Sequence, residues 1–94
     1  MKEQVWNNGT IVEGHDPAIW RKDACGAWIK YVEYSNRKSQ FGWEIDHISP
    51  GGMTILSNLR PLQWKNNLNK SDGRLKCSVL AKPDQEGHLN IENE

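Results

Sequence analysis

Residues 43–73, WEIDHISPGGMTILSNLRPLQWKNNLNKSDG, contain the pattern that decides the fold. Residues 43–48 alternate in character, which is typical of a half-buried strand. Residues 49–52 turn the chain, because proline cannot donate to a β-ladder and paired glycines tolerate positive φ. Residues 59–62 read as a second short extended segment. The stretch therefore predicts two short strands joined through a turn.

The next segment, residues 63–72, predicts a helix, because a glycine follows it where helices usually stop. Its faces separate. Trp64 and Leu68, four apart, can be buried together, whereas Asn67 and Lys70, three apart, lie on a polar face. The order strand, strand, helix predicts a small α+β domain.

The flanking sequence predicts further short elements. Asp16 followed by proline is typical of a helix N-terminus and predicts a helix over residues 18–22. Residues 27–32 predict a strand, the polar residues 34–42 predict a loop, and residues 77–80 predict another short strand.

The length of 94 residues predicts one domain. We expect a polar N-terminal extension at residues 1–14, the domain at residues 15–81, and an acidic, flexible tail at residues 82–94. The five tryptophans supply large buried areas, so we expect them to form the core.

The composition argues against a membrane protein, a secreted protein and a disulfide-rich protein. No apolar run approaches the ~20 residues that a membrane span needs, and the first residues lead into no hydrophobic signal segment. Cys25 and Cys77 stand far apart and form no CxxC pair, so neither a disulfide scaffold nor a cysteine-based zinc site is expected. A cytoplasmic location fits this pattern best.

The charges balance overall but are unevenly distributed. Twelve basic and twelve acidic residues give a formal net charge of zero. Basic residues gather at residues 20–40 and 58–76, whereas residues 84–94 hold acidic residues and no Lys or Arg. The basic middle favours a nucleic-acid partner, although from charge alone a merely solvated face is the stronger explanation.

The middle third also concentrates groups that bind hard cations and move protons: Asp46, His47, Asn58, Asn66, Asn67 and Asn69. One carboxylate with amide oxygens suits Mg²⁺ or Mn²⁺ better than Zn²⁺. A neutral imidazole beside them can take a proton from water near pH 7. With basic residues on the following helix, these groups point to metal-assisted phosphodiester hydrolysis.

At this point residues 43–73 resemble the HNH endonuclease family, which is built on the ββα-metal motif. The resemblance lies in an Asp-His pair at the end of a strand, a Pro-Gly-Gly loop, an Asn before Leu-x-Pro-Leu, and a helix that carries an Asn and a Lys. Each piece alone is a weak signal. The ordered set with these spacings is specific.

The resemblance implies a role for each matching residue. Asp46 and Asn67 would be the protein ligands of a divalent metal, Mg²⁺ or Mn²⁺, and His47 would be the general base. Asn58 would hold the His47 ring in its productive orientation. Lys70 would contact the scissile or an adjacent phosphate. Further DNA contacts are expected from the neighbouring basic residues Arg60, Lys65 and Arg74.

Many members of the family also carry two CxxC pairs that bind a structural zinc. Here Gln63 and Asn66 occupy the later pair, and the lead-in at residues 21–26 offers at most Cys25. A structural zinc is therefore not expected, and tryptophan packing would have to replace its stabilisation.

Strand geometry sets one condition on this assignment. In a regular strand Asp46 and His47 point to opposite faces, yet both must reach one phosphate. We therefore expect the strand to end or twist at this pair rather than run regularly through Ser49.

Other interpretations stay open for several residues. Asn58 alternatively stabilises the loop as an Asx-turn residue, and Asn66 replaces Asn67 as the ligand if the register shifts. His15 and His88 are expected to be structural or exposed. Glu44 is expected to face solvent, and the weaker alternative is that it supports the site residues.

The resemblance thus implies a divalent-metal-dependent endonuclease that nicks one strand of double-stranded DNA per active site. Little of the chain remains to read sequence, so specificity would come from a partner protein, and the chain would be a monomer or weak dimer. The alternatives are a non-catalytic HNH-like nucleic-acid-binding module and a toxin domain with an immunity partner.

Overall fold

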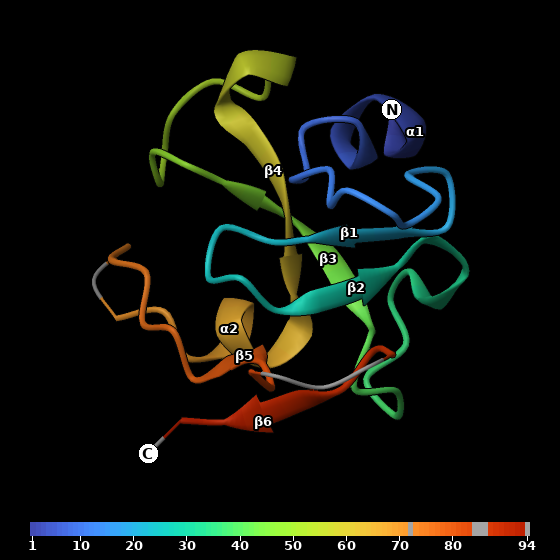
Figure 1. Ribbon diagram of the computed structural model, residues 1–94. Coiled ribbons are helices and arrows are strands. Elements are labelled where there is room, and N and C mark those ends of the chain that lie inside the picture. Colours follow the sequence, from blue (N-terminus) through green and yellow to red (C-terminus); the bar gives the residue numbers. More distant parts are fainter. Residues whose placement is uncertain (72, 84–86, 94) are drawn as a thin grey trace.

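The computed structural model describes residues 1–71, 73–83 and 87–93. Along the chain the elements are α1 Lys2–Trp6, β1 Trp20–Lys22, β2 Trp28–Lys30, the 3₁₀ turn η1 Tyr31–Glu33, β3 Trp43–His47, the 3₁₀ turn η2 Leu56–Asn58, β4 Leu59–Gln63, α2 Trp64–Leu68, β5 Val79–Ala81 and β6 Asn90–Glu92. Within the described residues the strands form three antiparallel pairs, β1–β2, β3–β4 and β5–β6 (Figure 1). The α+β class is confirmed.

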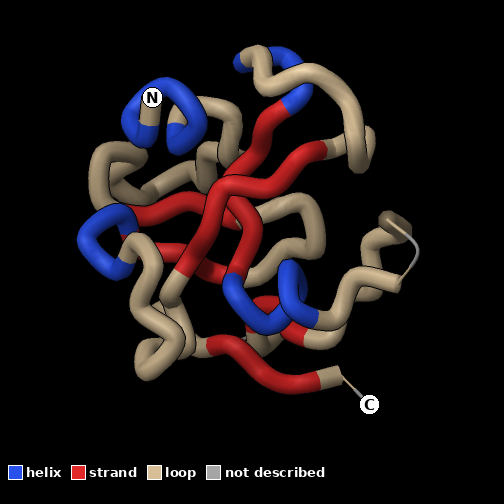
Figure 2. Tube along the Cα trace, turned by 180° about the vertical axis from the view of Figure 1, so that it is seen from behind, coloured by secondary structure: helices blue, strands red, loops and turns tan. Residues whose placement is uncertain are grey.

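The β3–β4 hairpin and α2 form the centre of the molecule. Figure 2 shows the hairpin running through the middle, with α2 at one end of it. The ladder pairs Trp43 with Gln63 and Asp46 with Arg60. Gln63 also ends β4 and caps α2, because its side-chain oxygen accepts the backbone N–H groups of Lys65 and Asn66. The predicted order strand, strand, helix is confirmed, although α2 is shorter than residues 63–72.

The core gathers around this hairpin. It consists of Val5, Trp6, Ile29, Trp43 and Leu59. The Trp6 and Trp43 ring centroids lie 5.1 Å apart. Of the five tryptophans predicted to form the core, Trp6 and Trp43 do so and Trp28 is also buried, whereas Trp20 and Trp64 are only half-buried. Helix α1 also belongs to the core. Residues 1–14 were predicted to be a polar extension, yet Val5 and Trp6 belong to the core. A short helix that is polar elsewhere can still bury its apolar side chains against the domain.

The helix predicted over residues 18–22 does not form. The Asp16 side chain accepts the backbone N–H of Ala18 at 2.9 Å, as an N-cap would. The backbone then makes a single turn before β1 begins at Trp20 and pairs with β2. Pairing with the next strand, β2, outweighs the local start signal here, since a five-residue helix gains little by itself.

A disulfide joins Cys25 and Cys77, whose Cα atoms lie 5.3 Å apart. The expectation that this chain carries no disulfide scaffold is therefore wrong. Separation along the sequence says little about separation in space, because Gly26 accepts the backbone N–H of Ala81 on β5 and so brings the two segments together. The cytoplasmic location stays a prediction, and it loses the support of unpaired cysteines.

The C-terminal segment closes against the body of the domain. β6 pairs with β5, and the Asn90 side chain bonds both the N–H and the carbonyl of Trp28, at 2.7 and 2.9 Å. Of the predicted tail at residues 82–94, residues 84–86 and 94 lie outside the described residues. Among the helices that the structure describes, none is long and apolar enough to cross a membrane.

Candidate active site

The strand β3 ends at His47, as the sequence assignment requires. Just past it lies an open hollow of about 460 Å³. Four of the predicted site residues line it: Asp46, His47, Asn67 and Lys70. The structure therefore brings together a carboxylate, an imidazole, an amide and an ammonium group that the sequence separates by up to 24 positions.

The Asp46 carboxylate is buried and pairs with two cationic side chains. Its side chain is only 4% exposed. One oxygen, Oδ2, accepts Arg60 Nε at 2.8 Å, and the other, Oδ1, accepts Lys70 Nζ at 2.5 Å. Arg60 lies directly opposite Asp46 in the β3–β4 ladder, so the hairpin register fixes that pair.

Arg60 and Lys70 thus belong to the site itself. Their side chains are 18% and 11% exposed, and Lys70 Nζ also donates to the His47 carbonyl at 3.2 Å. The sequence analysis placed both among the DNA contacts. In this structure their charge is directed at Asp46.

Asn67 is held by a residue that the sequence analysis left in solvent. Its Nδ2 donates to Glu44 Oε1 at 2.9 Å, and because a carboxylate can only accept, the amide oxygen of Asn67 must point elsewhere. Glu44 is 17% exposed and forms a double contact with Arg37 at 2.7 and 3.0 Å. These contacts with Arg37, aided by Asn67, hold the pKa of Glu44 below its usual range. The sequence did contain a signal for this role of Glu44, because Glu44 and Asp46 are two residues apart and therefore lie on the same face of the strand.

The His47 ring contacts Thr54, not Asn58. Its Nε2 lies 2.9 Å from the Thr54 hydroxyl. Thr54 stands in the loop between β3 and η2 and carried no signal in the sequence analysis. A hydroxyl can donate to or accept from the ring, so it orients the imidazole without fixing its tautomer.

Asn58 braces the loop after β3. Its Oδ1 accepts the N–H of Ser49 at 2.9 Å, and its Nδ2 donates to the carbonyls of Ser49 and Met53, at 3.3 and 2.9 Å. A Cβ at Gly52 would meet Asn58 Nδ2 at 2.9 Å, so glycine suits this close approach. The loop-stabilising alternative describes these contacts better than a direct contact with the imidazole.

Asn66 does not face the hollow. It is fully buried, and its Nδ2 donates to Asp23 Oδ2 and to the Val79 carbonyl while its Oδ1 accepts the N–H groups of Ser78 and Val79. The same Asp23 oxygen accepts the Gln63 N–H at 2.9 Å. A buried polar cluster therefore stands where the resemblance would place the later cysteine pair, and it adds to the tryptophan packing.

Burial raises the pKa of the Asp23 carboxyl, and the N–H donors around it oppose that shift. Those donors are Asn66 Nδ2 and the backbone N–H groups of Gln63, Ala27 and Cys25. Asp23 is thus satisfied by neutral partners alone.

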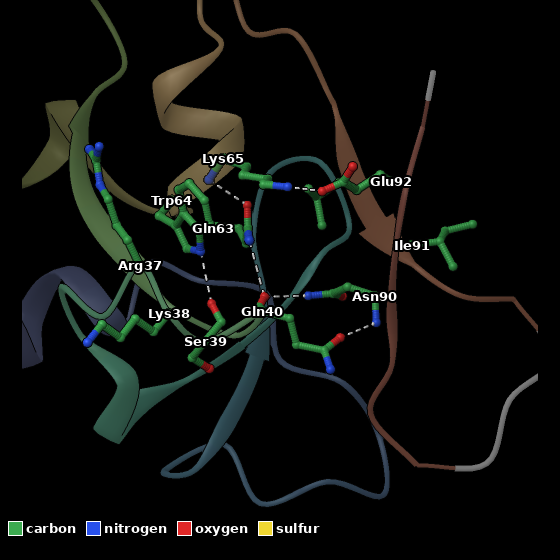
Figure 3. A pocket seen from close by; sticks show the side chains of 11 residues that line it. Arg37, Lys38, Ser39, Gln40, Gln63, Trp64, Lys65, Asn90, Ile91 and Glu92 are labelled. Carbon is green, nitrogen blue, oxygen red and sulfur yellow. Dashed lines mark hydrogen bonds and ion pairs between the residues drawn. The ribbon is translucent and has the colours of Figure 1, made fainter.

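The remaining basic candidates lie away from this hollow. Lys65 is ion-paired with Glu92 on β6 and lines a second hollow of about 280 Å³ (Figure 3). Arg74 is exposed, and its backbone bridges to Ser71. Neither is brought to Asp46.

The donor set can be compared with what a metal ion requires. Among the residues that the structure describes, no group of three or more His, Cys, Asp or Glu is placed to hold an ion. Mg²⁺ commonly takes one or two carboxylates and keeps several waters. Asp46 and Asn67 line one hollow and offer a carboxylate and an amide oxygen, while both Asp46 oxygens accept cationic side chains. No family model, curated protein or solved structure matches this chain.

Proposed function

We propose that this protein is a divalent-metal-dependent endonuclease that hydrolyses phosphodiester bonds in DNA and cuts one strand per active site. The observation that carries the proposal is the shared hollow: Asp46, His47 and Asn67 line one open cavity at the end of β3. A carboxylate, an amide and an imidazole in one place are what metal-assisted phosphate hydrolysis needs. The resemblance to the HNH family supports the same chemistry.

In this proposal Asp46 and Asn67 hold Mg²⁺ or Mn²⁺, and the metal supplies polarisation of the phosphate when bound. His47 takes the proton from the attacking water, and Thr54 keeps its ring in place. The hollow is open to solvent, so a phosphate can reach it. Asn58 acts one step back, since it fixes the loop on which Thr54 stands.

The substrate we propose is double-stranded DNA. One hollow serves one strand, so a single chain nicks, and a double-strand break needs two chains or two events. The described residues outside the site form short strands and turns, which leaves little surface for sequence reading. Tight specificity therefore requires a partner protein.

The test is nicking of supercoiled plasmid across a panel of divalent cations, with EDTA as the metal-free control. Mg²⁺ or Mn²⁺ should support nicking, and His47→Ala should lower the rate by ~10²–10⁴-fold. His15→Ala, which alters a histidine outside the hollow, is the matched control and should nick normally. Nicking that survives EDTA or His47→Ala unchanged would overturn the proposal.

A second function deserves the same assay. Because both Asp46 oxygens already accept cationic side chains, the carboxylate is fully paired and the site resembles a structural ion-pair network. A non-catalytic nucleic-acid-binding module would bind DNA with no nicking under any cation. DNA binding measured by fluorescence anisotropy beside the nicking assay separates the two.

A further inference from the structure

We infer that the Lys70 ammonium group is an internal stand-in for the metal: it occupies the Asp46 oxygen that the divalent cation must take, and metal binding displaces it. This inference rests on the proposed function for the identity of the ion. It adds a coupling that the proposed function does not contain, because the lysine becomes available to a phosphate only after the metal has replaced it.

The two cationic partners of Asp46 are held differently. Arg60 faces Asp46 across the β3–β4 ladder, so its position is set by the backbone hydrogen bonds of the hairpin. Lys70 lies beyond the end of α2 and reaches Oδ1 through a flexible four-carbon stem. Of the two, Lys70 is the partner that can leave without disturbing the strands.

The residues around the vacated oxygen include a second possible ligand. Lys70 and Asn67 are three residues apart and line the same hollow as Asp46. Glu44 fixes the amide group of Asn67, which leaves its oxygen free for a cation. A divalent ion shared by Asp46 and Asn67 therefore competes with the ammonium group for Asp46 Oδ1.

The exchange keeps a cation in contact with each oxygen of the buried carboxylate. If Lys70 simply left, Oδ1 of a carboxylate that is 4% exposed would lose its cationic partner while Arg60 stayed on Oδ2. A divalent cation compensates that carboxylate and repels the displaced ammonium group. Lys70 then moves toward the open side of the hollow, where a DNA phosphate supplies its next partner.

The consequence is a metal affinity that Lys70 lowers. When a binding-competent state is populated only in part, the apparent affinity falls by that fraction. If Lys70 holds Asp46 about nine-tenths of the time, its removal tightens metal binding by about tenfold. Substitution of a residue that merely stabilises the site would instead weaken binding.

The experiment is Mn²⁺ titration of the full chain, read from the electron paramagnetic resonance signal of the free ion. Lys70→Gln should bind Mn²⁺ about tenfold more tightly than wild type. Lys65→Gln is the matched control, since that lysine pairs with Glu92 instead, and its affinity should equal that of wild type. Equal, weaker or absent Mn²⁺ binding by Lys70→Gln overturns the inference.

A second measurement uses the wild-type chain and no substitution. The Lys70 ammonium protons, held by Asp46 and the His47 carbonyl, should give a side-chain ¹H–¹⁵N signal without metal. Saturating Mg²⁺ should abolish or shift it, and an unchanged signal contradicts the exchange. If Lys70→Gln binds Mn²⁺ more tightly but wild type does not nick DNA, the exchange stands and the nuclease function is refuted. If wild type nicks DNA but Lys70→Gln does not bind Mn²⁺ more tightly, the nuclease function stands and the exchange is refuted.

Discussion

Two buried aspartates, Asp23 and Asp46, are satisfied in opposite ways. Neutral N–H groups surround Asp23, including those of Gln63 and Asn66. Two cations, Arg60 and Lys70, balance Asp46. Neutral, fixed donors make Asp23 part of the scaffold, whereas in our proposal Lys70 is an exchangeable partner that leaves Asp46 open to a ligand.

The adjacent asparagines of α2 repeat this division. Both amide atoms of Asn66 form hydrogen bonds, to Asp23 and to the backbone around β5, and the residue is fully buried. Asn67 makes its bond to Glu44 and lines the hollow. Consecutive helix positions point about 100° apart, so one short helix can serve the scaffold with one residue and the site with the next.

The largest predicted effect separates the two aspartates by their stability. In Asp23→Asn the new NH₂ group faces donors, so we expect a loss of ~3–5 kcal/mol in the free energy of unfolding. In Asp46→Asn the amide oxygen can still accept one cation, and Lys70 lines the open hollow where it can reach water, so we expect a smaller loss of ~1–3 kcal/mol. Urea melts followed by tryptophan fluorescence measure both, and equal losses would refute the division.

The next largest predicted effect on stability comes from the disulfide, which lies beside the Asp23 cluster. Cys25 donates its N–H to Asp23, and Cys77 precedes the Ser78 N–H that binds Asn66. Reduction should cost ~2–4 kcal/mol of stability, because the bond closes a long loop. Melts with and without dithiothreitol measure this loss. The Cys25→Ser/Cys77→Ser double variant should be equally destabilised and insensitive to the reductant, while its Mn²⁺ affinity should stay that of wild type.

The contrast also shows what sequence can reveal. Residues 43–63 predicted β3, the turn and β4, because alternation and Pro-Gly-Gly are local signals. The start of α2 followed from the same logic. The pairing of Cys25 with Cys77, the burial of Val5 and the formation of β6 depend on contacts between distant segments, and no local pattern announces those.

For the site, the identities were predicted but the contacts were not. Asp46, His47, Asn67 and Lys70 do meet at one hollow. The sequence did not show which side chains support the site residues. Glu44 orients the amide of Asn67, and the hydroxyl of Thr54 reaches the imidazole of His47. Such supporting contacts arise from strand register and loop shape, and a single sequence encodes both only indirectly.

A smaller effect, on metal affinity, is expected at Glu44, which supports Asn67 in the candidate site. Glu44→Gln keeps the shape of the side chain but can present its NH₂ group to Asn67, so the amide is no longer held in one orientation. We expect Mn²⁺ affinity to fall by about tenfold, as for other residues that support a metal ligand. The free energy of unfolding should change little, because Glu44 is partly exposed. An unchanged affinity would remove Glu44 from the site.

The smallest predicted effect is a pH response confined to the scaffold. His88 stacks on Trp20 with ring centroids 3.6 Å apart and bonds His15 at 2.8 Å. Burial, with added repulsion from His15 and Lys30, lowers the pKa of His88 below 6.5. The unfolded chain therefore binds a proton more readily than the folded one, so the stabilisation present above pH 6.5 declines as the pH falls below it.

Thermal melts at pH 7.5 and pH 5 measure this response, and His88→Gln, which cannot titrate, is the control. Wild type should lose more stability than His88→Gln between these values, since the variant retains every other titrating group. An equal loss in both chains would show that His88 only fills space.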